Sequence, residues 1–129
     1  MLTIDHIVLT VSDINKTAKF YTEILEMTLE EFKPPGTTQS RFALRFGTQK
    51  INLHSVFQPF KPHAKHPLSG SADICFISNK SIHLWIEKFE KHSVLIEEGP
   101  VQRTGACGRL TSVYVRDPDG NLIEISNQN

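Results

Sequence analysis

The sequence contains 129 residues, of which 39% are hydrophobic, a composition that suits one compact domain. A chain of this length leaves no room for a cofactor domain beside a separate substrate domain. Fourteen Lys and Arg balance fourteen Asp and Glu, so the net charge is zero. Because no basic excess exists to hold a phosphate backbone or an anionic lipid surface, we expect neither nucleic acid nor membrane as a partner.

The hydropathy pattern points to a soluble, cytoplasmic protein. No apolar stretch approaches the roughly 20 residues that cross a bilayer, and no charged-then-apolar signal segment opens the sequence. The two cysteines, Cys75 and Cys107, lack CxxC spacing, which favours free thiols over a disulfide or a redox motif.

The first half of the sequence predicts a strand, a helix and two more strands. Residues 4–11 are rich in β-branched side chains, and Ser12-Asp13 then offers capping groups to a segment with apolar residues at helical spacing. Residues 41–46 and 50–57 both alternate polar and apolar side chains, as half-buried strands do.

The second half repeats this order. Residues 73–78 predict a short strand, and Ser81 is placed to cap a helix whose apolar residues recur at helical spacing. The later strands are predicted at Leu95-Ile96, Thr111 to Arg116 and Leu122 to Ser126, with a tight turn at Asp117 to Gly120.

The sequence therefore predicts an α+β protein built from two similar β-α-β-β modules, each with one additional short strand. Module one covers about residues 1–57 and module two about residues 72–129. The segment of about residues 58–71 contains three prolines, which exclude a central strand or a continuous helix, so we expect a linker. Closure of the modules within one chain or between two chains stays open.

Aligning the two modules brings polar residues into register. The hairpin turns match Asn52 with Glu124, and the first strands match His6 with Asp73, while His54 follows Asn52 on the same strand face. If the two modules pair about a pseudo-two-fold axis, we expect these side chains to approach one another in a shared pocket. Imidazole and carboxylate groups are suitable ligands for Ni, Zn, Mn, Fe or Co ions, and the lack of a thiolate disfavours a structural zinc site.

Several segments give the sequence a family likeness. Residues 5–11 followed by Phe20-Tyr21, and residues 116–124 around the tight turn, resemble the vicinal oxygen chelate superfamily, which includes glyoxalase I, extradiol dioxygenases and fosfomycin-resistance proteins. Residues 50–54 and 99–106 resemble, more narrowly, the glyoxalase domain-containing protein 5 group. The resemblance implies paired βαβββ modules forming an open, cup-shaped mixed β-sheet with helices on the outside, and it also implies a homodimer.

The resemblance further implies a divalent metal ion that chelates adjacent oxygens of a small-molecule substrate. His6 and Glu124 match the first and last ligand positions of the superfamily. Asp73 stands where the second module commonly has His, and it can still ligate through oxygen. Asn52 stands at a glyoxalase I ligand position as a weak neutral ligand, so His54 either replaces it or contacts substrate.

Other polar residues are candidate substrate contacts with ordinary alternatives. Arg103 and Arg109 lie beside glycine-containing turns and can hold a substrate carboxylate or phosphate, although solvated loop charges are the commoner explanation of this pattern. Tyr114 either faces the pocket or packs within its strand. Gly105 and Gly108 indicate a flap over the cup or a simple turn.

The leading hypothesis is a glyoxalase-like isomerase or lyase. Glu124 or Asp73 removes a proton next to a carbonyl of a substrate with vicinal oxygens, and the metal ion stabilises the resulting enediolate. An extradiol-type dioxygenase requires His54 beside His6 at the ion. A non-catalytic protein that binds or sequesters a small molecule or drug is the alternative from a different class, and it predicts no metal dependence.

Overall fold

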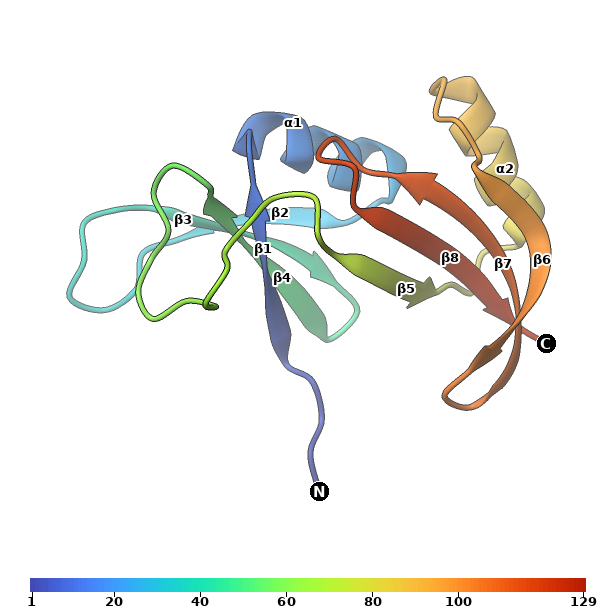
Figure 1. Ribbon diagram of the computed structural model, residues 1–129, viewed down its shortest axis with the longest axis horizontal. Coiled ribbons are helices and arrows are strands. Elements are labelled where there is room, and N and C mark those ends of the chain that lie inside the picture. Colours follow the sequence, from blue (N-terminus) through green and yellow to red (C-terminus); the bar gives the residue numbers. More distant parts are fainter. The chain divides into compact units, whose positions relative to one another are not determined.

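Each half of the chain folds into a four-stranded mixed sheet with a helical segment against one face (Figure 1). The computed structural model describes all 129 residues, which divide into unit 1, Met1–Gly70, and unit 2, Ser71–Asn129. The predicted α+β class and βαβββ order are therefore confirmed within each unit. Most of the Pro-rich segment, up to Gly70, falls within unit 1.

Unit 1 places its first and last strands side by side. Its elements are β1 (His6–Val11), α1 (Ile14–Lys19), the π-helix η1 (Phe20–Ile24), β2 (Thr28–Phe32), β3 (Arg41–Phe46) and β4 (Gln49–Ser55). The strand order is β1-β4-β3-β2, with β1 parallel to β4 and the other pairs antiparallel.

The core of unit 1 lies between one sheet face and the helical segment. Leu9, Val11, Ile51 and Leu53 are almost fully buried on this face, because alternation along each strand sends every second side chain to the same side. Tyr21 of η1 is also fully buried. Burial of each such side chain contributes about 1.5–3 kcal/mol. The opposite face of the sheet is left to the polar residues described below.

The predicted helix start is confirmed, but the helix does not continue regularly. Asp13 caps α1 by accepting a hydrogen bond at Oδ1 from the Lys16 N–H (2.9 Å). After Lys19 the backbone widens into η1, where the Leu25 N–H reaches back five residues to the Phe20 carbonyl.

Unit 2 repeats the same topology. Its elements are β5 (Asp73–Ile77), α2 (Ile82–Lys91), β6 (Glu98–Gly105), β7 (Gly108–Arg116) and β8 (Leu122–Gln128). The strand order is β5-β8-β7-β6, with β5 parallel to β8. One sheet face packs on α2, where Trp85 and Phe89 lie against a buried stripe of Val113, Val115, Ile123 and Ile125.

The start of α2 is fixed by two side chains. The predicted cap Ser81 accepts from the His83 N–H (3.3 Å), and the Ile82 N–H donates to Asn127 Oδ1 of β8 (2.7 Å). These bonds satisfy backbone donors that have no partner within the helix. None of the helices has the length and apolarity that spanning a bilayer requires.

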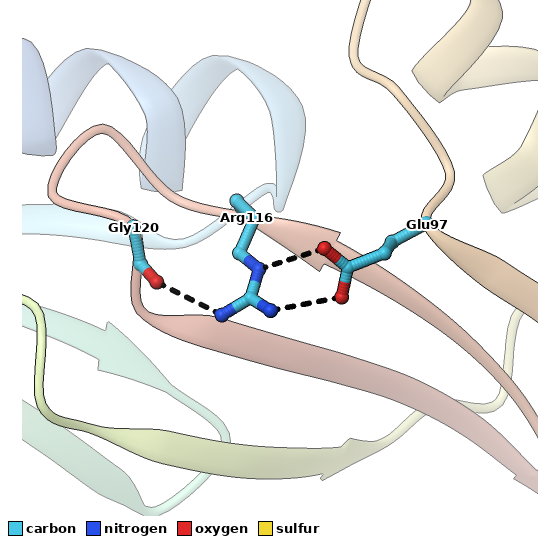
Figure 2. A network of polar contacts seen from close by, with 3 residues as sticks. All are labelled: Glu97, Arg116 and Gly120. Carbon is cyan, nitrogen blue, oxygen red and sulfur yellow. Dashed lines mark hydrogen bonds and ion pairs between the residues drawn. The ribbon is translucent and has the colours of Figure 1, made fainter.

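The strand predicted at Leu95-Ile96 is wrong. Leu95 is 82% exposed, and β6 begins only at Glu98, after the Glu97 N–H has donated to the Tyr114 carbonyl of β7 (2.8 Å). The side chain of Glu97, just before β6, forms an ion pair with Arg116 (Figure 2). The Arg116 guanidinium donates from Nε and Nη2 to the two carboxylate oxygens of Glu97 (3.1 and 2.9 Å). Its Nη1 also donates to the Gly120 carbonyl (3.2 Å).

Residues 105–108 form a hairpin tip. Gly105 pairs with Gly108, so Ala106 and Cys107 make a two-residue turn and β7 begins three residues earlier than predicted. Gly108 has a φ of +125°, a conformation that L side chains rarely adopt. The turn alternative for these glycines is therefore confirmed by the backbone.

The predicted turn at Asp117 to Gly120 is closed by buried side chains. Asp117 Oδ1 accepts from the N–H groups of Asp119 and Asn121 (2.9 and 3.0 Å). The Asn121 amide donates to Asp117 Oδ2 (2.8 Å) and accepts from the Ala72 N–H (2.8 Å). The turn thus fixes the start of β5 against β8, immediately beside Asp73.

Candidate functional site

Each sheet has a polar face opposite its helical segment. In unit 1, the strand registers place His6 and Thr10 of β1, Lys50, Asn52 and His54 of β4, and Arg41 and Arg45 of β3 on this face. In unit 2 the corresponding face holds Asp73, Cys75, Ser112, Tyr114, Glu124 and Ser126. All predicted site residues except Arg109 lie on these two faces.

The two units present their predicted residues in the same diagonal arrangement. His6 is aligned with Lys50, so Asn52 lies two residues further along the neighbouring parallel strand. Asp73 is aligned with Leu122, so Glu124 has the same two-residue offset from Asp73. His6 and Asp73 thus hold equivalent positions in the two sheets, and so do Asn52 and Glu124.

His6 is oriented by its neighbour. Its Nδ1 lies 2.8 Å from Asp5 Oδ2, and this hydrogen bond lowers the pKa of the Asp5 carboxyl below its ordinary value. Donation from Nδ1 leaves a lone pair on Nε2. A carboxylate behind a histidine is a common support for metal ligation through the other ring nitrogen. Both side chains are substantially exposed, as an ordinary surface pair would be.

Asn52 carries an unpaired polar atom. Its Oδ1 is buried and has no hydrogen-bond partner within the protein. A buried carbonyl oxygen without a partner is costly, typically about 1–3 kcal/mol. The atom therefore fits a position that receives a donor or a cation from a bound molecule.

The register separates His54 from His6. His54 is aligned with Thr10, four residues beyond His6 along the parallel strands, or roughly 13 Å at about 3.3 Å per residue. Side chains stand approximately perpendicular to a sheet, so two imidazoles this far apart do not reach one ion at about 2.1 Å each. Asn52, not His54, occupies the position next to His6.

His54 is instead packed beneath the Pro-rich segment. It is 7% exposed, and its ring meets the Phe60 ring edge-on with centroids 5.3 Å apart. Burial lowers the pKa of His54 below its ordinary value, and the positive charges of Arg41 and His63 lower that pKa further.

Glu124 is held by a hydroxyl network. Ser126 Oγ donates to Glu124 Oε2 (3.2 Å) and lies 2.6 Å from Ser112 Oγ and 3.3 Å from Cys75 Sγ. Because a serine has one hydroxyl proton, Ser126 must accept from both Ser112 and Cys75 when it donates to Glu124. Loss of solvation raises the pKa of the Cys75 thiol, which keeps it protonated and able to donate.

Tyr114 and Arg103 form a second group on this face. Arg103 Nε donates to the Tyr114 hydroxyl (2.9 Å), and Arg103 Nη2 lies 3.3 Å from Glu98 Oε1. Burial raises the pKa of Tyr114. Tyr114 is aligned with Glu124, so three predicted site residues share one face. Arg109 lies on the opposite face of β7 and is not brought to them.

Some polar residues of these faces were not predicted from the sequence. Cys75 and Ser126 follow from strand alternation, which places them on the same face as Asp73 and Glu124. The contact of Phe60 with Arg41 and His54 had no sequence signal, because it depends on the path of an irregular segment.

The donor set fits a divalent ion only in part. No group of three or more His, Cys, Asp or Glu side chains in the structure is arranged to hold a metal ion. Each unit contributes two matched positions: an imidazole and a buried amide oxygen in unit 1, and two carboxylates in unit 2. Nitrogen and oxygen donors of these kinds suit Ni, Zn, Mn, Fe or Co ions.

Comparison with known proteins extends over nearly the whole chain. The family model of the glyoxalase/bleomycin resistance protein/dioxygenase superfamily matches residues 3–125. Virulence protein STM3117 of Salmonella typhimurium is 52% identical over 123 residues, covering 95% of this chain and 82% of that protein. Its crystal structure has a TM-score of 0.93 at 49% identity, covering 100% of this chain and 98% of that one.

A second relative comes from a fungus. Glyoxalase domain-containing protein RDO1 of Mycosarcoma maydis is 47% identical over 123 residues, covering 95% of this chain and 66% of that protein. The narrower resemblance to the glyoxalase domain-containing protein 5 group stays a prediction.

More distant structures share the fold alone. Lactoylglutathione lyase from Agrobacterium tumefaciens has a TM-score of 0.71 at 23% identity, covering 97% of this chain and 92% of that one. TnmS3, an antibiotic binding protein from Streptomyces, has a TM-score of 0.73 at 17% identity, covering 100% and 98%. One fold thus serves both an enzyme and a binding protein.

Proposed function

The chain belongs to the glyoxalase/bleomycin resistance protein/dioxygenase superfamily, and from that premise we propose a divalent-metal-dependent enzyme of the isomerase or lyase type. Its substrate is a small molecule with vicinal oxygens. The observation that supports the proposal is the matched pair of ligand positions on the polar face of each unit, His6 with Asn52 and Asp73 with Glu124.

His6 in unit 1, and Asp73 and Glu124 in unit 2, are the side chains proposed to ligate Ni, Zn, Mn, Fe or Co. His6 offers Nε2 because Asp5 occupies Nδ1, and Ser126 supports Glu124 through a hydrogen bond to Oε2. Asn52 is assigned to substrate through its unpaired oxygen. His54, whose register separates it from His6, is assigned to substrate instead of the ion.

The chemistry proposed for the site is proton transfer next to a carbonyl. When bound, the ion supplies Lewis-acid stabilisation of negative charge on vicinal oxygens. Glu124 or Asp73 accepts the proton; Asp73 is the more exposed carboxylate, whereas Glu124 is oriented by Ser126. Tyr114, held by Arg103 and aligned with Glu124, orients substrate on the same face. Arg109 has no place in this assignment.

A second candidate is a non-catalytic protein that binds or sequesters a small molecule. It is favoured by the departures at Asn52 and Asp73, where a neutral amide and a carboxylate replace stronger nitrogen or charged ligands. TnmS3, an antibiotic binding protein, illustrates this use of the same fold. An extradiol-type dioxygenase is less well supported, since it needs His54 beside His6 at the ion.

Metal analysis of the purified chain, prepared without chelator, tests the proposal. We expect close to one equivalent of a transition metal per chain, and strong loss of the metal in His6→Ala and Glu124→Ala. His63→Ala is the matched control, because His63 is an exposed histidine of the Pro-rich segment whose Nδ1 already contacts the Ala64 carbonyl. Less than about a tenth of an equivalent, with no gain after reconstitution, would favour the binding protein.

The proposed partners are a small-molecule substrate and a second copy of the chain. The superfamily resemblance implies the homodimer, which light scattering can test.

A further inference from the structure

Three polar groups without hydrogen-bond partners meet at one end of the unit 1 sheet. Arg41 Nε and Asn52 Oδ1 are buried and unpaired. The His54 imidazole, more than nine-tenths buried, has an aromatic contact with Phe60 but no hydrogen bond. Buried polar atoms are paired in the great majority of cases, so the two unpaired atoms of Arg41 and Asn52 require an explanation.

Arg41 is a cation that lacks a carboxylate. Its strand neighbour Arg45, on the same face, is paired with Glu30, whereas no acidic residue contacts Arg41. The guanidinium carbon of Arg41 instead lies 3.9 Å from the centre of the Phe60 ring. Because the flat face of the guanidinium stacks on the ring, its N–H groups, which lie in the guanidinium plane, do not point at Phe60. That edge includes the unpaired Nε.

The three groups are close together on the sheet face. Phe60 contacts both side chains: the Arg41 guanidinium lies over its ring, and the His54 ring meets it edge-on. Asn52 lies two residues before His54 on β4, points to the same face, and is aligned with Ala43 of β3. The group therefore offers guanidinium N–H donors, an imidazole and an amide oxygen.

We propose that Arg41, His54 and Asn52 form a recognition site for a small carboxylate that carries a hydroxyl group, with Phe60 as its packing support. The Arg41 edge holds the carboxylate by paired N–H donors, the geometry that guanidinium groups form with planar carboxylates. The His54 ring supplies a further N–H. The unpaired Asn52 oxygen accepts the hydroxyl proton of the ligand.

A carboxylate is favoured over a phosphate by the charge at the site. Arg41 is the one guanidinium there, Arg45 is neutralised by Glu30, and Lys50 lies over the Phe32 ring (4.5 Å). One unpaired cation matches the single charge of a carboxylate, whereas tight phosphate sites generally combine several cations or backbone N–H groups.

This site extends the proposed function by naming a substrate class, but its test requires no metal and no turnover. The metal-free protein is titrated with acetate and with glycolate at constant ionic strength, and binding is followed by NMR through the Arg41 Nε–H and the His54 ring. We expect saturable binding of both, with glycolate tighter because its hydroxyl reaches Asn52.

Variants separate the site from general charge. Arg41→Gln should weaken acetate binding about tenfold or more, as expected for loss of a charge-assisted hydrogen bond, while Arg45→Gln, the matched control on the same strand face, should leave it unchanged. Asn52→Ala should remove the preference for glycolate over acetate and retain acetate binding.

Several outcomes would overturn the site. These are absence of saturable binding to the wild-type protein, equal weakening by Arg41→Gln and Arg45→Gln, and tighter binding of inorganic phosphate than of acetate. The wild-type Arg41 Nε–H signal gives a result even where Arg41→Gln does not fold. If carboxylate binding is found and metal is not, the proposed enzyme fails while this site stands.

Discussion

At the scale of single residues, burial makes one histidine sensitive to pH. His54 is enclosed beside Phe60 and Arg41, and burial first, then the charges of Arg41 and His63, lower its pKa below the ordinary value of 6.5. The unfolded chain therefore binds this proton more readily than the folded chain. Its contribution to stability is fully present above pH 6.5 and is lost as the pH falls through the lowered folded-state value.

We expect His54→Gln to flatten this acid-side decline in stability. Urea unfolding of the wild-type chain and of the variant, measured on both sides of pH 6.5, gives the two slopes of unfolding free energy against pH. A wild-type slope no steeper than that of His54→Gln would contradict the assignment.

Ser126 is the residue through which the unit 2 network reaches Glu124. Ser126→Ala removes the hydroxyl that donates to Glu124 Oε2, and it leaves Ser112 without its partner. If Glu124 is a ligand, loss of this supporting hydrogen bond should lower metal affinity about 10–100-fold. Competition with a chromogenic chelator measures the change.

Ser112→Ala is the matched control for Ser126→Ala. Both serines are fully buried and both substitutions should cost about 1 kcal/mol of unfolding free energy. Only Ser126 touches Glu124, so only its replacement should change the metal affinity. Equal affinities in the two variants would remove Ser126 from the site and leave it a packing residue.

At the scale of elements, the turn between β7 and β8 carries a stability prediction. Asn121 is fully buried and joins Asp117 to the Ala72 N–H at the start of β5. Asn121→Ala removes the amide that bonds Asp117 Oδ2 and the Ala72 N–H, so we expect a loss of about 3 kcal/mol in unfolding free energy. Chemical denaturation provides the measurement.

Asn129→Ala is the corresponding control. Asn129 also makes two side-chain hydrogen bonds, to Thr111 and Gln102, but it is exposed. Water replaces those bonds in the variant, so the expected loss is within about 0.5 kcal/mol. Similar losses in the two variants would show that burial of the Asn121 network is not what stabilises the turn.

Local sequence signals predicted most elements of the fold. The caps Asp13 and Ser81 and the turn at Asp117 to Gly120 carry their own chemistry, so the helix starts and the last hairpin were correctly placed. Strand alternation was sufficient to put Asn52 and His54 on one face. Each of these inferences depends on residues close together in the chain.

The differences arise where distant residues decide the structure. Leu95-Ile96 has the composition of a strand, but β6 begins only at Glu98. The sequence did not decide whether Asn52 or His54 lies beside His6. The register between β1 and β4 decides it, because it places Asn52 two residues and His54 four residues further along the sheet than His6. The contact of Phe60 with Arg41 depends on the path by which the Pro-rich segment packs against the unit 1 sheet. Secondary-structure propensity does not specify such a path.

At the scale of the whole molecule, the net charge of zero conceals an asymmetry between the duplicated units. Unit 1 carries eight Lys and Arg residues against six Asp and Glu residues. Unit 2 carries six Lys and Arg residues against eight Asp and Glu residues. The same topology therefore presents an unpaired guanidinium and imidazoles on one polar face and carboxylates on the other. The two-residue offset between His6 and Asn52 is the same as that between Asp73 and Glu124, but the side chains at these positions differ in charge. This difference is expected if unit 1 recognises an anion and unit 2 supplies anionic ligands.

The whole molecule also carries the prediction of a homodimer. The outer strand β1 leaves one edge of its backbone without a strand partner, and Val8 on β1 is 47% exposed. Exposed apolar edges of this kind favour association with another chain. Light scattering should therefore give a mass about twice the 14.6 kDa of the chain.

Charge placed on this edge should dissociate the dimer. We expect Val8→Lys to shift the mass toward that of one chain, because a buried ammonium without a partner opposes association. Leu84→Lys is the matched control: Leu84 is 51% exposed on α2, whose buried side chains face the sheet. A wild-type mass of one chain at every concentration would contradict the dimer, and dissociation by both substitutions would mean that β1 is not the edge responsible.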